Sequence, residues 1–296
     1  MIKIKVPATT ANVGPGFDSF GIALNLYNEI EIEETNKQTE LLQEGNVSDI
    51  PKEKNLIYTS LTKVLDEHSY KYKGFRINIS KCNIPISRGL GSSASCITAG
   101  VIAANKILGN TLSEEDVLKT CTKIEGHPDN IAPALLGGMV VSLMDNDNVI
   151  FSKVKVPNNV NFAIMIPEFK VSTEDARKVL PSSYSKEDCI FNISRASMLI
   201  AAMNNGEIEK LRICTEDKIH QPYRKHLIKN IDNIFNKCKE LGSLCEFISG
   251  SGSTLAAIVK KDNKKFINNL NNYLATLDGN WKVHLLEADY SGAKIL

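Results

Sequence analysis

The sequence predicts an α+β protein built from two domains. Segments in which apolar and polar residues alternate are interspersed with segments of helical period, so strands and helices are mixed along the chain. The 296 residues are enough for two domains. Strands give way to a series of helices near residues 155–160, and we therefore divide the chain into domains 1–157 and 158–296.

In the first domain, alternation predicts strands and a one-sided apolar face predicts helices. We place the strands at 2–6, 21–34, 75–79, 139–143 and near 149–156. We place the helices at 55–68, 92–108 and 113–124, with a fourth that ends at Gly137. The run Ser113-Glu114-Glu115-Asp116 is typical of a capped helix start.

The second domain is predicted to be richer in helix. Its helices are placed at 173–180, 186–204, 207–214, 225–241 and 263–277. Its strands are placed at 161–166, 244–248, 254–259 and 281–287. The final strand-helix-strand pattern is typical of half of a ferredoxin-like layer.

Charge and cysteine content restrict the class of protein. Lys and Arg number 35 against 34 Asp and Glu, a net charge of +1, so nothing indicates a nucleic-acid or membrane partner. The N-terminal segment lacks the apolar run of a signal peptide. The seven cysteines form no C-x-x-C pair, which is typical of free thiols in a reducing compartment. We therefore expect a cytoplasmic protein.

The segment 85–95 carries the strongest indication of chemistry. It combines glycines with serines and leads directly into a helix of small residues; its members are Pro85, Ile86, Ser87, Arg88, Gly89, Leu90, Gly91, Ser92, Ser93, Ala94 and Ser95. Glycines let backbone amides approach a ligand closely, and a helix start offers free N–H groups and a positive dipole end. The segment therefore predicts a cradle for phosphate groups.

Other interpretations fit this segment less well. It lacks the lysine of a Walker A loop. Gly89, Gly91 and Ala94 match a dinucleotide fingerprint, but the preceding strand does not lead directly into the loop and Glu114 lies at a helix start. A simple turn that caps a helix would need neither this length nor these serines.

Two further loops are rich in polar residues or glycine. The loop 7–21 carries Asn12 and Asp18, and a polar turn is as good an explanation for it as a role in ligand binding. The loop 249–253 lies between two apolar strands. It predicts either a glycine-rich hairpin or a second backbone surface against the phosphate loop.

The three loops, in this order, resemble the GHMP kinase family of galacto-, homoserine, mevalonate and phosphomevalonate kinases. The run P-x-x-x-G-L-G-S-S-A-S is similar to the phosphate loop of that family. Four further runs resemble its homoserine kinases: P-A-T-x-A-N-x-G-x-G-F-D from Pro7, E-G-H-P-D-N from Glu125, S-T-x-x-A-R-x-x-L-P from Ser172 and H-Q-P-Y-R from His220. The resemblance extends from Pro7 to about Ile258.

This resemblance implies a fold and an activity. The fold is an N-terminal domain like ribosomal protein S5 domain 2, joined to a C-terminal ferredoxin-like domain, with the substrates in the cleft between them. The activity is ATP- and Mg²⁺-dependent phosphorylation of a small alcohol, with L-homoserine as the expected acceptor on the route to threonine. A homodimer is also implied.

The resemblance also implies roles in nucleotide and metal binding. The phosphates of ATP would lie on the loop from Pro85 to Ser95, with Asn55 on the adenine side. Ser93, or else Ser92, would hold Mg²⁺ together with Glu125. These hard oxygen ligands are the ones that magnesium prefers.

The acceptor is a zwitterion, so it needs a seat for its ammonium group and another for its carboxylate. Asn12, Asp18 and His127 match the family's contacts to the ammonium end. Arg177 and Arg224 match the carboxylate clamp, a task for which planar guanidinium groups are suited.

Asn130 stands where some relatives have a catalytic aspartate. Because an amide cannot accept a proton as a general base, we expect Asn130 to orient the acceptor hydroxyl while the phosphate takes the proton late. We expect the neighbouring Asp129 to cap a helix that begins near Asn130 rather than to act as the base.

Other functions remain open at this point. Mevalonate has no ammonium group and galactose has no charge, so the zwitterion seat disfavours both as acceptors. A sensor that keeps the fold without catalysis would be expected to lose Glu125 or the paired serines, and all are present. A nicotinamide dehydrogenase is the remaining alternative.

Overall fold

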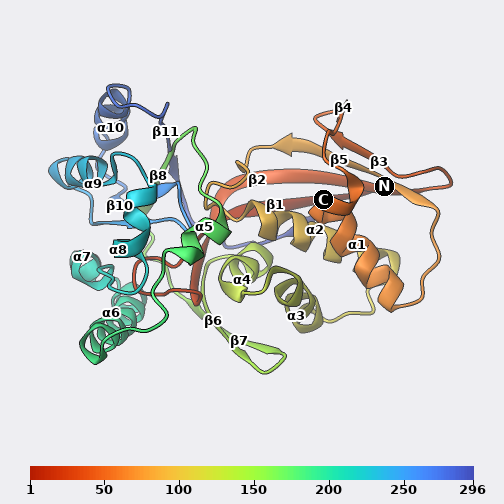
Figure 1. Cartoon of the computed structure of the whole chain (residues 1–296), viewed down its shortest axis with the longest axis horizontal. Coiled ribbons are helices and arrows are strands. Elements are labelled where there is room, and N and C mark those ends of the chain that lie inside the picture. Colours follow the sequence, from red (N-terminus) through yellow and green to blue (C-terminus); the bar gives the residue numbers. More distant parts are fainter.

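The computed structural model describes residues 1–296 and contains two β-sheets that lie side by side (Figure 1). The strands of the first sheet are β1 (Ile2–Ala11), β2 (Phe20–Thr35), β3 (Glu40–Gln43), β4 (Asn46–Val47), β5 (Gly74–Cys82), β6 (Met139–Asp145), β7 (Asn148–Val154) and β12 (Lys294–Ile295). Their order is β12-β1-β2-β5-β3-β4, with β6 paired to both β2 and β7. All pairs are antiparallel except β3 with β5.

Four helices cover one face of the first sheet (Figure 1). They are α1 (Leu56–Glu67), α2 (Ser92–Ile107), α3 (Glu114–Glu125) and α4 (Pro128–Leu136). Their apolar residues form one buried cluster with the inward side chains of β1, β2 and β5. The predicted cap of α3 is confirmed, because the Ser113 side chain accepts from the Asp116 amide and the Asp116 carboxylate accepts from Ser113.

The second sheet carries helices on both faces. Its strands are β8 (Val160–Ile166), β9 (Cys245–Ile248), β10 (Leu255–Lys260) and β11 (Lys282–Leu286), in the order β11-β8-β10-β9. Along β8, Phe162 and Ile164 belong to one buried cluster, whereas Ala163 and Met165 belong to another. This period of two is the strand pleat, and it explains why both faces are apolar. One face packs against α6 (Lys186–Asn205) and α7 (Leu211–Cys214), the other against α9 (Ile231–Glu240) and α10 (Phe266–Leu274).

One buried cluster joins the two halves of the molecule. It contains Ala8, Val13 and Leu90 from the first half together with Phe162, Phe247 and Ile258 of the second sheet. All six side chains are at most 1% exposed. The phosphate loop is therefore anchored, through Leu90, in a core to which both halves contribute.

The α+β fold class is confirmed, and two local predictions need correction. The helix expected at 225–241 is interrupted: a short turn at Lys225–Leu227 precedes α9, and Asn230 between them has a φ of +62°. This left-handed conformation ends helical geometry. The helix expected at 207–214 is a 3-10 turn at Ile208–Lys210 followed by α7.

The end of the chain returns to the first sheet. β12 pairs with β1, and Ala288 forms a bridge with Leu24. These short pairings were not predicted, nor were β3 and β4. The division at residues 157 and 158 remains a prediction. None of the helices combines the length and apolar character needed to cross a membrane.

Candidate active site

A cavity of about 450 Å³ opens between the two halves of the molecule. Most of the expected site residues line it: Asn12, Asp18, Asn55, Ile86, Ser87, Arg88, Gly89, Gly91, Ser92, Ser93, Glu125, His127, Asn130, Arg177 and Arg224. Four others of the phosphate loop do not line it, namely Pro85, Leu90, Ala94 and Ser95. The last three are buried behind the loop, where they anchor it.

The phosphate loop has the backbone geometry of an anion cradle. Gly89 and Gly91 have φ values of +76° and +68°, a region that favours glycine. A Cβ on Gly89 would overlap the carbonyl oxygen of Ser249, and one on Gly91 would overlap the hydroxyl of Thr9. Helix α2 starts without a side-chain cap, and its first internal bond runs from the Ser95 amide. The three preceding amides therefore have no partner within the helix.

The second half of the molecule holds the phosphate loop in place. The Ser249 hydroxyl donates to the Gly89 carbonyl at 2.6 Å, and the Thr254 amide donates to the Arg88 carbonyl at 3.1 Å. Backbone atoms of Ser249 and Gly252 lie directly against Gly89, so the loop 249–253 forms a backbone surface against the phosphate loop. The Arg88 guanidinium donates to the carbonyls of Pro167, Ile86 and Glu168, so its hydrogen bonds stabilise the loop.

Ser93 and Glu125 meet at the mouth of the cradle. The Ser93 hydroxyl donates to Glu125 Oε2 at 2.5 Å. Burial raises the pKa of the Glu125 carboxyl, and the Ser93 hydrogen bond partly offsets this. The half-buried carboxylate and the hydroxyl are hard oxygen ligands that fit a small divalent cation. The free amides at the start of α2 fit a phosphate group beside it.

Asn55 is placed at the start of α1. Its side-chain oxygen accepts from the amides of Ile57 and Tyr58, both at 3.1 Å, so it caps the helix. Its side-chain nitrogen forms no hydrogen bond within the protein, and Asn55 lines the cavity. The role of Asn55 beside adenine remains a prediction.

Asp18 and Arg177, expected at opposite ends of the acceptor, contact each other. Two parallel hydrogen bonds of 3.0 and 2.8 Å join the Arg177 guanidinium to the Asp18 carboxylate. Arg177 lies on α5 (Thr173–Lys178), which stands between the two halves in Figure 1. The side chains are 40% and 35% exposed, so the pair is accessible to a ligand that exchanges partners with it.

Arg224 is a buried cation without an anionic partner. It ends α8 (Gln221–Arg224) and is 2% exposed. Its guanidinium donates to the carbonyls of Ala176 and Gly250, both at 3.1 Å, and it forms no salt bridge. Burial and the neighbouring Arg177 charge lower the pKa of Arg224 to about 10. Because a buried charge is costly until it is paired, this site favours an anion.

The expectation that Asp129 caps a helix near Asn130 is wrong. α4 begins at Pro128, and His127 occupies the cap position without a side-chain hydrogen bond. Proline fixes the first helical position, so Asp129 falls inside the first turn. Its carboxylate instead accepts from His127 Nδ1 at 2.5 Å and from the side-chain nitrogen Nδ2 of Asn130 at 3.3 Å.

Asp18, His127 and Asp129 form an anionic corner of the cavity. Their ligand atoms all lie within 4.8 Å of one another. Burial lowers the pKa of His127, but the hydrogen bond and charge of Asp129 outweigh this and raise it overall. The corner therefore favours a cationic group.

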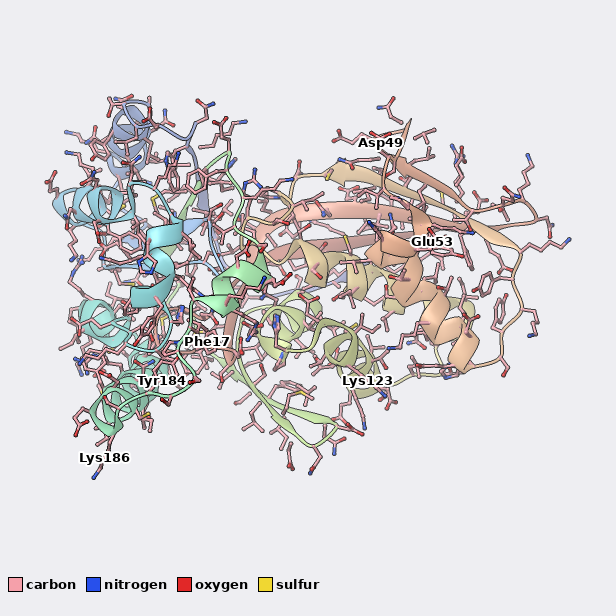
Figure 2. The ribbon with its side chains drawn as sticks, in the orientation of Figure 1. Phe17, Asp49, Glu53, Lys123, Tyr184 and Lys186 are labelled. Carbon is pink, nitrogen blue, oxygen red and sulfur yellow. The ribbon has the colours of Figure 1, made fainter.

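Thr9 and Phe17 contact site residues and were not predicted. The Thr9 hydroxyl donates to Asn130 Oδ1 at 2.7 Å and fixes the orientation of that amide. The Phe17 ring lies between the two halves (Figure 2), with Arg177 and Arg224 at 5.6 and 5.0 Å from its centre. Both stand in the P-A-T…G-F-D run, so proximity to Asn12 and Asp18 was the available signal.

These features define a two-domain phosphotransferase of small molecules, and the comparisons with known proteins agree. Residues 55–138 match the model of the GHMP kinases N terminal domain, and residues 199–276 match that of the GHMP kinases C terminal. The chain belongs to the GHMP kinase family.

Full-length similarity places the chain with the homoserine kinases of that family. It is 60% identical to a homoserine kinase from Clostridium novyi (strain NT), over 100% of this chain and 99% of the relative. It is 54% identical to a homoserine kinase from Clostridium kluyveri, over 100% and 98%. The crystal structure of homoserine kinase from Cytophaga hutchinsonii superposes with a TM-score of 0.88 at 28% identity, covering 100% of this chain and 97% of that one.

Proposed function

We propose that the protein transfers the γ-phosphoryl group of ATP to the hydroxyl of L-homoserine, which forms O-phospho-L-homoserine and ADP. This product stands on the route to threonine. The observation that carries the proposal is the charge arrangement beside the phosphate loop. An anionic corner at Asp18, His127 and Asp129 faces a cationic one at Arg177 and Arg224, within one cavity.

This arrangement supports an amino-acid acceptor. The ammonium group of homoserine pairs with the anionic corner. Asn12 lies on the same side, where its side-chain nitrogen donates to the Gly250 carbonyl. The carboxylate satisfies Arg224, whose charge has no counterion in the protein, and takes over Arg177 from Asp18. A zwitterion supplies a partner to both corners, whereas mevalonate supplies a carboxylate and no cation.

Nucleotide binding is supported by the loop from Gly89 to Ser93 and the free amides at the start of α2. We propose that Ser93 and Glu125 hold Mg²⁺, which supplies charge neutralisation for the transferring phosphoryl group. Ser93 is favoured over Ser92 because its hydroxyl already contacts Glu125.

We propose that Asn130 orients the acceptor hydroxyl. Its side-chain oxygen accepts from Thr9, and its side-chain nitrogen donates one hydrogen to Asp129. These two contacts fix the orientation of the side chain and leave the second hydrogen for the acceptor hydroxyl. Phosphoryl transfer does not require a strong base, so the hydroxyl proton of the acceptor passes to the transferred phosphate late in the reaction. Asp129 accepts from both His127 and Asn130, and it therefore positions the Asn130 side chain.

A coupled ADP-release assay with homoserine, mevalonate and galactose as acceptors tests the proposal. We expect turnover with homoserine, dependent on Mg²⁺, and none above background with the other two. Turnover with mevalonate alone would assign another kinase of the family. Binding of ATP without turnover of any acceptor would assign a ligand sensor.

We also propose a cytoplasmic location and a homodimer. The location is supported by the seven cysteines, all of which are free thiols. The homodimer is supported by the resemblance to the family only, and sedimentation measurements test it.

A further inference from the structure

His220, in the second half of the molecule, is fully buried against the loop 7–21 of the first half. Its ring is 0% exposed and stacks on Phe17, with centres 5.3 Å apart and planes at 24°. Nε2 lies 2.8 Å from the carbonyl oxygen of Gly14, and Nδ1 lies 3.3 Å from Nη1 of Arg224. The imidazole thus contacts both the loop 7–21 of the first half and Arg224, the cation without an anionic partner.

These two partners fix the tautomer of His220. A carbonyl oxygen only accepts, so Nε2 must carry the hydrogen that is donated to Gly14. A guanidinium only donates, so Nδ1 must be the unprotonated acceptor for Arg224. A protonated ring would direct an N–H at another N–H, and this arrangement therefore requires the neutral form.

The surroundings of His220 keep the ring neutral. Burial is the main cause of a lowered pKa, which the charge of Asp217 opposes and that of Arg224 reinforces; Asp18 acts more weakly in the same direction as Asp217. Asp217 lies 3.7 Å from Nε2, but its carboxylate is occupied by the backbone amides of Ile219, His220 and Gln221 and by the Asn192 side chain. It therefore forms no direct hydrogen bond with the imidazole.

Every hydrogen-bond partner of Arg224 is consequently neutral. Two carbonyl oxygens and one imidazole nitrogen take its Nε and Nη1 groups, while Nη2 donates to no protein atom. A carboxylate in the place of His220 would orient the guanidinium equally well but would cancel its charge.

We propose that His220 is a positioning residue for acceptor binding, which orients Arg224 toward the substrate carboxylate and leaves its positive charge unneutralised. This rests on the proposed function for the identity of the acceptor. His220 touches neither substrate nor nucleotide, and it acts through Arg224.

The kinetic test compares His220→Phe with wild type. Phenylalanine keeps the ring and its stack on Phe17 but removes both hydrogen bonds. We expect the KM for homoserine to rise by about 10-fold to 100-fold, as for loss of an oriented charged hydrogen bond. We expect kcat and the KM for ATP to change less than about twofold, because the phosphate site is untouched. Equal losses in all three constants would overturn the proposal.

Matched variants separate positioning from folding. His220→Gln retains one donor and one acceptor and should recover part of the homoserine affinity. His226→Phe, at an exposed histidine nearby, should match wild type. In an Arg224→Ala background, His220→Phe should have no further effect on the KM for homoserine. An additive effect there would show that His220 acts independently of Arg224.

A substrate-free measurement separates this proposal from the proposed function. ¹⁵N NMR of labelled wild-type protein should show His220 with Nε2 protonated and Nδ1 unprotonated at neutral pH. A protonated Nδ1 would overturn the positioning role whichever acceptor the enzyme uses. Absence of homoserine turnover in wild type, with this tautomer present, would overturn the proposed function only.

Discussion

Asp18 and Arg177 neutralise each other in the absence of substrate. Their double hydrogen bond is the bidentate geometry that gives arginine–carboxylate pairs their strength. A zwitterionic acceptor replaces this pair with two equivalent ones, so no charge is left unpaired. An acceptor that carries only a carboxylate can pair with Arg224 but supplies no cation to Asp18, so taking Arg177 as well would leave Asp18 without a partner, which costs free energy.

The first prediction concerns this exchange. Asp18→Asn should lower kcat/KM for homoserine by about 10-fold to 100-fold, since a charged contact worth about 1.5–3 kcal/mol is lost. Turnover of 4-hydroxybutyrate, which has no ammonium group, should fall much less or rise, because Arg177 is released for its carboxylate. Steady-state kinetics with both acceptors provide the comparison. A proportionate loss with both would exclude Asp18 as the ammonium seat.

The second prediction concerns Asp129 and the proton. If Asp129 only positions His127 and Asn130, then Asp129→Asn should lower kcat by about tenfold, the effect of one charged hydrogen bond. A general base would contribute about 10²-fold to 10⁴-fold. Single-turnover kinetics on protein with an unchanged melting temperature distinguish the two. A loss above about 10³-fold would restore a base mechanism.

At the scale of elements, α2 and its loop form a unit in which small residues are required. Gly91 lies where α2 begins, between the Thr9 hydroxyl and the cavity. The run of alanines and serines that follows lets α2 approach α1 so closely that a Cβ on Gly100 would overlap the Ser60 hydroxyl. The uncharged segment in the sequence is therefore explained by packing.

The third prediction tests this unit. Gly91→Ala should lower ATP affinity by more than about tenfold, because the new Cβ must displace Thr9 and with it the loop. Gly109→Ala is the matched control: it has a similar φ of +81°, but nothing lies within 4 Å of the added Cβ. Left-handed strain should cost each variant about 1–2 kcal/mol of stability, and Gly91→Ala should lose more because its Cβ also overlaps Thr9.

Thermal melting and the KM for ATP provide these two readouts. Retained ATP affinity in Gly91→Ala, with the same drop in melting temperature as the control, would contradict the assigned cradle.

Elements with local signals were predictable, and those fixed by distant partners were not. Ser113 and Asp116 lie three residues apart, so their cap was visible in the sequence. β12 is two residues long, and only its contact with β1 defines it as a strand. In the site, the phosphate loop was visible in one stretch. The contact between Thr9 and Asn130 joins residues 121 positions apart, and no local pattern encodes it.

At the scale of the whole molecule, His127 and His220 change the free energy of unfolding in opposite directions as the pH changes. The pKa of His220 is lowered in the folded state from its ordinary value of 6.5, mainly by burial. Below about pH 6.5 the unfolded chain therefore binds a proton that the folded protein does not, and stability falls. The pKa of His127 is raised in the folded state, so the folded protein binds this proton more tightly than the unfolded chain. The stability that His127 contributes is fully present below about pH 6.5 and is lost as the pH rises through its folded-state pKa.

The fourth prediction follows for His220. The difference in unfolding free energy between wild type and His220→Phe should shrink as pH falls from 7 to 5, because the variant has no proton to gain at this position. Urea unfolding curves across this range measure it, with His226→Phe as the control. A difference that is constant or grows on acidification would show that His220 is charged in the folded state.

The phosphate loop is held by a loop from the other half of the chain, through the contact of Ser249 with Gly89 and of Thr254 with Arg88. A chimera that transplants the C-terminal half of a different family member, in order to redirect the enzyme to a new alcohol, would exchange these contacts at the same time. Such an exchange would change nucleotide affinity together with acceptor choice. The transplanted C-terminal half must therefore be chosen so that it also makes these contacts with the phosphate loop.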